Sequence, residues 1–217
     1  MIKKIRQYIR ASSVYRYLEN KTDRVILFSS LTTVIALILA LIKLGLGMIL
    51  DSAWLLGFGS YYLMLVLGKV WLTYRYTKIR KDETQAFDQS EYFWGGILFS
   101  LLGLIFAVFC LFMAFHGLNQ HFAKLVTYLI ALIGFVKIIS ASISLVRGRR
   151  LHNPLVNLLK SFNVANGAVA LVLTQYAILM MKGAPYANYS TGLFGCGIGL
   201  LIVLIGLGFI WHGWRVN

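Results

Sequence analysis

The sequence is poor in acidic residues, and its second half has none. Only seven of the 217 residues are Asp or Glu, and none follows Glu91. Catalysis by paired carboxylates, metal clusters of Asp and His, and acid-based proton relays all need groups that the stretch from Tyr92 to Asn217 lacks. The missing acids therefore exclude many kinds of function for this half of the chain.

Cysteine, proline and charge are scarce as well. The two cysteines, Cys110 and Cys196, lie in apolar runs and offer no disulfide framework, and two prolines provide no rigid linker. Hydrophobic residues make up 59% of the chain and charged residues 13%, against about 45–50% and about 25% in soluble domains. A water-soluble fold of this length could not hide so much apolar surface, which indicates a polytopic membrane protein.

Six apolar stretches are long enough to cross a bilayer. A spanning helix needs about 20 apolar residues because the hydrocarbon core is about 30 Å thick. In lipid the backbone must satisfy its own hydrogen bonds, which favours helices over open strands. The stretches cover residues 25–50, 53–73, 92–115, 124–146, 155–180 and 193–212. We therefore predict an all-α polytopic membrane protein, with a six-helix transmembrane bundle in residues 25–217.

The distribution of lysine and arginine predicts the orientation of this bundle. Fifteen of them fall before the first helix, in the loop 74–91, between the fourth and fifth helices and at the C-terminus, whereas the opposite side has only Lys124 and Lys182. Positive charge collects on cytoplasmic flanks. We expect both termini and the loop 74–91 to be cytoplasmic, in a multi-pass protein of a bacterial plasma membrane.

The net charge of +14 is largely this topological bias, so we expect no nucleic-acid partner. Residues 1–24 form a basic stretch with apolar residues at helical spacing. Such a segment lies on the membrane surface against anionic lipid. We expect a cytoplasmic interfacial segment there.

Lysines at membrane depth are the residues that most need a physical explanation. Lys43 and Lys137 are far from the ends of their helices, where a lysine costs at least about 2.5–3.5 kcal/mol. Lys69 and Lys160 lie nearer the inner ends, where snorkelling to the interface is cheaper. No helix contains an acid to pair with them. The deep pair could be neutral, could bond to carbonyls and Ser or Asn side chains, or could face an anionic ligand.

The fifth helix carries the strongest polar pattern. Asn163 and Asn166 lie within a run of amides and hydroxyls spaced by three and four residues, which predicts a helix inside the bundle. They could line a polar path or simply bond between helices. Lys137, Ser140 and Ser144 share one face of the fourth helix, and packing that face on the fifth would join the two sets. The candidate substrate-binding residues are Lys43, Lys137, Ser140, Lys160, Asn163 and Asn166.

Small residues at helical spacing predict close helix packing. Gly96, Ser100, Gly103 and Ala107 recur in the third helix, and glycines recur in the sixth. Such residues let helices approach closely, within the bundle or between the subunits of a homodimer. His116 and His121 flank an outer loop with no Cys, Asp or Glu close in sequence to complete a metal site. We expect no catalytic residues, no metal and no cofactor.

Two segments carry a resemblance to a known family. The first runs Leu41-Ile42-Lys43-Leu44-Gly45, then Asp51-Ser52-Ala53-Trp54-Leu55-Leu56; the second runs Phe135-Val136-Lys137-Ile138, then Arg147-Gly148-Arg149-Arg150-Leu151-His152-Asn153-Pro154-Leu155. They are similar to the first-to-second and fourth-to-fifth helix passages of the cation diffusion facilitators. The resemblance covers most of residues 25–212 and implies six helices with cytoplasmic termini.

The chain departs from that family at the metal site. The resemblance implies Asp and His ligands one turn apart on the second and fifth helices, but residues 57–65 have no metal ligand and residues 159–167 offer amides and a lysine. Neutral amides hold zinc poorly, and a lysine repels a cation. The resemblance also implies a cytoplasmic metal-sensing domain after the sixth helix, which we expect to be missing here. The resemblance therefore implies a degenerate scaffold that is not a divalent-metal transporter by its own ligands.

Two functional readings remain open. One is a transporter-like protein that binds or moves a small polar or anionic solute through a cavity lined by Lys and Asn. The alternative is a non-transporting accessory or scaffold subunit that acts through helix contacts. An intramembrane enzyme is disfavoured because the sequence places no histidine at membrane depth beside a second catalytic group.

Overall fold

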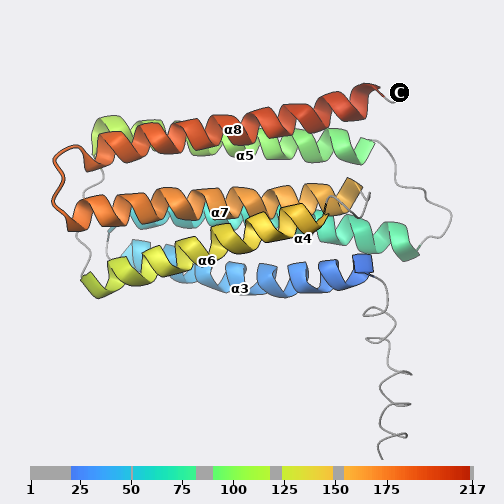
Figure 1. Ribbon diagram of the computed structural model, residues 1–217, viewed down its shortest axis with the longest axis horizontal. Helices are drawn as coiled ribbons and strands as arrows, with labels where there is room; N and C mark the ends of the chain where they lie inside the picture. The colour runs from blue at the N-terminus through green and yellow to red at the C-terminus, as the bar shows by residue number, and fades with distance from the viewer. Residues whose placement is uncertain (1–20, 50, 82–89, 118–123, 149–153, 216–217) are drawn as a thin grey trace, which may run out of the picture.

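The computed structural model describes residues 21–49, 51–81, 90–117, 124–148 and 154–215, and they form long helices without a strand (Figure 1). Each helix has 25 to 29 residues, which corresponds to about 38–44 Å. The helices are α3 (Lys21–Ile49), α4 (Ala53–Lys81), α5 (Ser90–His116), α6 (Lys124–Gly148), α7 (Pro154–Met181) and α8 (Ala187–Arg215). The predicted all-α fold with six long helices is confirmed.

Most of these helices have the length and composition of membrane spans. Among the described residues, α3, α4, α5, α7 and α8 contain windows that are long and apolar enough to cross a bilayer. In α6 the apolar stretch found is shorter, Thr127–Ile143. Large apolar side chains cover the outside of the bundle, as in Ile38, Leu132 and Leu204. That surface suits lipid rather than water.

Two helix boundaries differ from the sequence prediction. Helix α4 continues to Lys81 instead of ending near residue 73, so the predicted loop 74–91 is partly helical. Helix α8 begins at Ala187 rather than near residue 193, because helix can extend through polar residues beyond the apolar core. Residues 1–20 and 82–89 lie outside the described part of the chain, and with them most of the predicted interfacial segment 1–24.

Capping interactions fix the turn between α3 and α4. The Ser52 amide donates to the Gly47 carbonyl at 2.9 Å, and the Leu55 amide donates to the Ser52 hydroxyl at 3.3 Å. Asp51 has a φ of 46°, the left-handed conformation that commonly ends a helix. Ser52 is therefore the N-cap of α4, and the turn sets the angle at which α4 folds back on α3.

The helices pack as three antiparallel pairs, α3 with α4, α6 with α7 and α5 with α8 (Figure 1). Helix α7 contacts each of the other described helices, and none of its residues between Asn157 and Met181 is exposed. The prediction that the polar fifth helix lies inside the bundle is confirmed. The first residue of α3 and the last of α8 lie at the same end of the bundle (Figure 1).

Helices α5 and α8 interlock through small residues. A Cβ atom added to Gly103 would lie 2.8 Å from the Gly199 carbonyl oxygen, and one added to Gly199 would lie 2.7 Å from the Ala107 amide nitrogen. The Ser100 hydroxyl donates to the Val203 carbonyl at 3.4 Å. The predicted packing face of the third helix is thus used within the chain. This contact leaves no such face of α5 for a second subunit.

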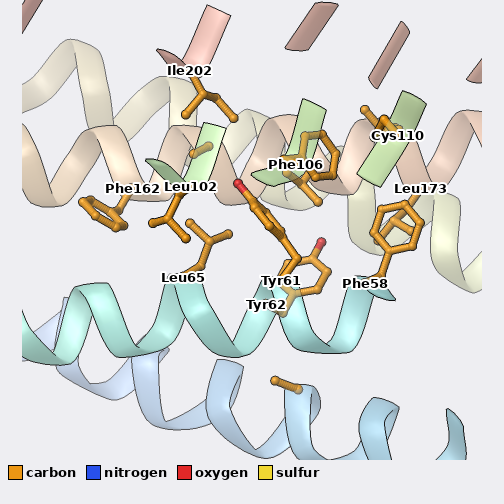
Figure 2. Packing of buried hydrophobic residues seen from close by; sticks show 14 of the residues in the cluster. Phe58, Tyr61, Tyr62, Leu65, Leu102, Phe106, Cys110, Phe162, Leu173 and Ile202 are labelled. Atoms are coloured by element: carbon orange, nitrogen blue, oxygen red, sulfur yellow. The ribbon is translucent and has the colours of Figure 1, made fainter. Parts of the chain in front are cut away.

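Aromatic rings, among them Phe58, Tyr61 and Phe106, lie together with aliphatic side chains on the side of α4 that faces away from α3 (Figure 2). Phe58 and Tyr61 project from α4 and meet the ring of Phe106 on α5, with centroids 6.2 and 4.7 Å away. Phe162 of α7 packs against Phe99 of α5 at 5.0 Å. These bulky contacts join the α5–α8 pair to the other four helices. The core of the molecule is therefore centred on α4 and α7.

Candidate functional site

Three helices bring two deep lysines onto one aromatic ring. The Lys43 ammonium of α3 lies 4.1 Å from the ring centroid of Tyr62 on α4, and that of Lys137 on α6 lies 4.8 Å from the same centroid. The two nitrogens are therefore within about 9 Å of each other. Tyr62 is 4% exposed. We refer to Lys43, Tyr62 and Lys137 as the lysine–tyrosine site.

Small residues next to both lysines let the helices close around the ring. Ala40 and Gly47 are buried on either side of Lys43, one turn away in α3. Gly134 and Ala141 are buried on either side of Lys137 in α6. Side chains three or four residues apart share a helix face. Each lysine therefore lies on the packed face of its helix, with a long side chain among short neighbours.

The ring compensates the two charges only in part. A cation above an aromatic ring gains about 0.5–1 kcal/mol at exposed sites and about 2 when desolvated. Each deep lysine costs at least about 2.5–3.5 kcal/mol. The described structure shows no hydrogen bond or ion pair from either ammonium, and Lys137 acts electrostatically on Lys43 as a like charge. The arrangement therefore costs more free energy than the ring returns.

A third lysine bonds across the bundle close by. The Lys69 ammonium of α4 donates to the Asn163 side-chain oxygen of α7, and Lys69 is 2% exposed. The prediction that Lys69 snorkels to the interface is wrong, because α7 supplies an acceptor inside the bundle. Lys69 follows Tyr62 by seven residues, about 10 Å along one face of α4. Lys69 therefore lies about two turns of α4 from the lysine–tyrosine site.

Several polar atoms in this region have no hydrogen-bond partner in the described structure. They are the hydroxyl oxygens of Tyr61 and Tyr62 and the side-chain oxygen of Asn166. Asn166 lies one turn from Asn163 on α7, so the two amides share a face. Buried polar groups are nearly always hydrogen-bonded, so these atoms are candidates for contact with a polar ligand. The two hydroxyls can donate or accept a hydrogen bond, whereas the Asn166 oxygen can only accept one.

Two of the predicted substrate-binding residues, Ser140 and Lys160, do not belong to the lysine–tyrosine site. Ser140 is exposed on α6 and lies away from the lysine–tyrosine site. The packed face of α6 passes through Gly134, Lys137 and Ala141 instead. Lys160 was expected to reach the interface by snorkelling. Its side chain is instead buried, with 3% of its surface exposed. It lies one turn from Asn163 toward the start of α7. The structure joins Asn163 to Lys69 rather than to Ser140.

Tyr62 and Lys69 are site residues that the sequence prediction did not include. Their signal was present in residues 57–69, where two tyrosines occupy the interior of a span. Tyrosine in a membrane helix usually lies at the interface. A tyrosine about 14 Å into α4 therefore points to a polar interior. Which lysines it meets depends on the packing of α3 and α6, which no local pattern specifies.

Carboxylates and metal ligands are sparse around the site. Among the side chains that the structure describes, Asp51 is the only carboxylate, and it is exposed at the turn before α4. No group of three or more His, Cys, Asp or Glu residues lies close together in the described part of the chain. His116 bonds to the Phe112 carbonyl of its own helix at 3.2 Å. Among the described side chains, the site therefore has cations without a neighbouring cluster of metal ligands.

The comparisons with known proteins offer no guide to this site. No family model matches the chain, and no curated protein or solved structure is significantly similar to it.

Proposed function

We propose that this integral membrane protein has a transporter-like core, formed by α3, α4, α6 and α7, that binds and moves a small polar or anionic solute. The observation that carries the proposal is the lysine–tyrosine site, where two ammonium groups share one ring inside the bundle. Ionisable residues within spanning helices are expensive and generally mark solute pathways or partners. A solute that accepts hydrogen bonds would satisfy these groups.

The proposed path follows the face shared by α4 and α7. From Tyr62 it passes Lys137 and reaches Lys69, Asn163 and Asn166, whose polar side chains come from three helices. Asn166 has a buried oxygen without a partner, and Asn163 already accepts from Lys69. Polar groups placed at successive heights could pass a solute along the bundle. No step of this role needs an enzyme activity or a cofactor.

The scaffold is proposed to be that of a cation diffusion facilitator whose metal chemistry is lost. Its support is the correspondence of α4 and α7 to the two helices that hold the metal in that family. These helices contact each other here, and the meeting groups are a lysine and an asparagine rather than carboxylates. A cation would be repelled at this position. The proposed solute is therefore not a divalent metal.

The test is solute uptake by the purified protein in liposomes. We would compare radiolabelled chloride, acetate, phosphate and sulfate, with empty liposomes as the baseline. We expect protein-dependent uptake of at least one of these anions, reduced at least tenfold by Lys137→Met because the substitution removes one of the two charges on Tyr62. Lys124→Met is the matched control, since Lys124 is exposed at the start of α6. Uptake at the baseline for all four anions would count against the proposal.

A further inference from the structure

The lysine–tyrosine site brings two ammonium groups close enough for one compact oxyanion to reach both. Their nitrogens are at most about 9 Å apart, because each lies close to the same ring centroid. Two charge-assisted N–H···O bonds take about 2.8 Å each. With the short spacing of the oxygens in one carboxylate, phosphate or sulfate group, these bonds span a nitrogen separation of up to about 8 Å.

Tyr62 supplies a third group for such a ligand. Its hydroxyl oxygen is buried without a hydrogen-bond partner, and a phenol can donate to an anion. The described surroundings contain no carboxylate that could compete for the two ammonium groups, because Asp51 is exposed at the turn between α3 and α4. The site thus combines two positive charges and a free donor. A cation would be repelled, and a neutral solute would leave both charges unbalanced.

Access favours a small anion over a partner helix. Tyr62 is 4% exposed, and both lysines lie on packed faces of their helices, so an acid on another membrane subunit could reach them only if the bundle opened. Lys43 lies six residues before the end of α3, about 9 Å along the axis. A compact ion needs to travel only this far from the end of the bundle where α3 turns into α4.

We infer that Lys43, Lys137 and the Tyr62 hydroxyl form a binding site for a compact oxyanion, of the carboxylate, phosphate or sulfate class. The inference rests on the proposed function and specifies its solute. The two ammonium groups lie over the Tyr62 ring. In the proposed site they donate to the oxygens of the anion, together with the phenol.

The test is equilibrium binding of radiolabelled sulfate and phosphate to the full chain purified in detergent, with acetate as competitor. We expect saturable binding, weakened at least tenfold by Lys43→Met and by Lys137→Met and lost in the double variant. Tyr62→Phe should weaken it severalfold because it keeps the ring and removes the donor. Tyr61→Phe is the matched control, since Tyr61 has an equally buried and unpartnered hydroxyl but faces Phe106.

The possible results distinguish three questions: whether the site binds an oxyanion, where that oxyanion comes from, and whether the protein transports it. Displacement of the bound anion by phosphatidylglycerol in mixed micelles would identify a lipid headgroup as the source of the oxyanion. If phosphatidylglycerol does not displace it, the ligand is a free ion. Both results support the site. Binding without uptake in liposomes would support the site and remove transport. No saturable binding of the three anions, or binding unchanged in the double variant, would overturn the inference. If the Met variants fail to fold, the comparison of Tyr62→Phe with Tyr61→Phe decides.

Discussion

At the residue scale, the unusual feature is that lysines on packed helix faces contact a ring and an amide rather than acids. Lys43 and Lys137 share Tyr62, and Lys69 donates to Asn163. Acids at these positions would have neutralised the lysines and closed the site to other anions. The aromatic and amide partners instead hold the lysines in place while leaving the positive charge available.

The bond between Lys69 and Asn163 gives a test of this interior. Asn163→Leu removes the acceptor and leaves a buried amine without its partner, which typically costs about 1–3 kcal/mol. Adding Lys69→Met removes the orphaned amine. We therefore expect the double variant to be more stable than Asn163→Leu alone, in thermal unfolding of the detergent-solubilised protein. Strictly additive losses in the double-mutant cycle would show that the two side chains do not interact.

The sequence predicted part of this site, and the missing part has a physical reason. Depth along a helix follows from counting residues, so Lys43 and Lys137 were identified as the lysines that need a partner. The rotation of a helix about its axis depends on its neighbours. Ser140 has correct spacing from Lys137 but lies on the exposed side, because the close approach of α6 to α7 is made by Gly134 and Gly167. Small residues would have been the better guide to the buried face.

At the element scale, the helices make two kinds of contact, one between small residues and one between large residues. The α5–α8 pair is joined by glycines whose added Cβ atoms would collide with the partner backbone. The contact of this pair with α4 and α7 is instead made by rings such as Phe58 and Phe106. Spacing of three and four residues predicted the first kind of contact. Contacts between bulky residues carry no comparable pattern, so the sequence did not predict which helices the pair would pack against.

A glycine in the α5–α8 contact and an exposed glycine of α8 offer a matched comparison. Gly103→Ala places a Cβ 2.8 Å from backbone atoms of α8, and such overpacking typically costs about 1–3 kcal/mol. Gly197→Ala meets nothing within 4 Å and replaces a poor helix former by a good one. We expect a lower midpoint of thermal unfolding for the first variant and an unchanged or higher midpoint for the second. Equal tolerance of both would contradict the close α5–α8 contact.

At the scale of the whole molecule, the chain forms a bundle whose most polar helix is its most central one. Composition and the length of the apolar runs predicted six helices, and the amides of α7 predicted its interior place. Helix α6 pairs with α7 as expected, although Ser140 of its predicted polar face lies on the exposed side. The six helices put the start of α3 and the end of α8 at one end of the bundle (Figure 1). The excess of lysine and arginine at this end supports the proposal that it is cytoplasmic.

The proposed function requires the interior around α7 to be accessible to water and solute. It is tested most directly by labelling single cysteines with a membrane-impermeant thiol reagent, in a Cys110→Ala, Cys196→Ala background. Asn166→Cys reports on the proposed path, and Leu132→Cys on the exposed apolar face of α6. Lys182→Cys and Thr77→Cys, both exposed near opposite ends of the bundle, report the two sides of the membrane.

In intact cells we expect labelling at position 182, labelling at position 77 only after permeabilisation, and none at position 132, which faces lipid. The account predicts that Asn166→Cys is labelled from at least one side of the membrane, and that an oxyanion bound at the lysine–tyrosine site slows the reaction. If Asn166→Cys remained unlabelled from both sides while the controls behaved as expected, the bundle would be closed and packed, and the proposed solute path would be contradicted.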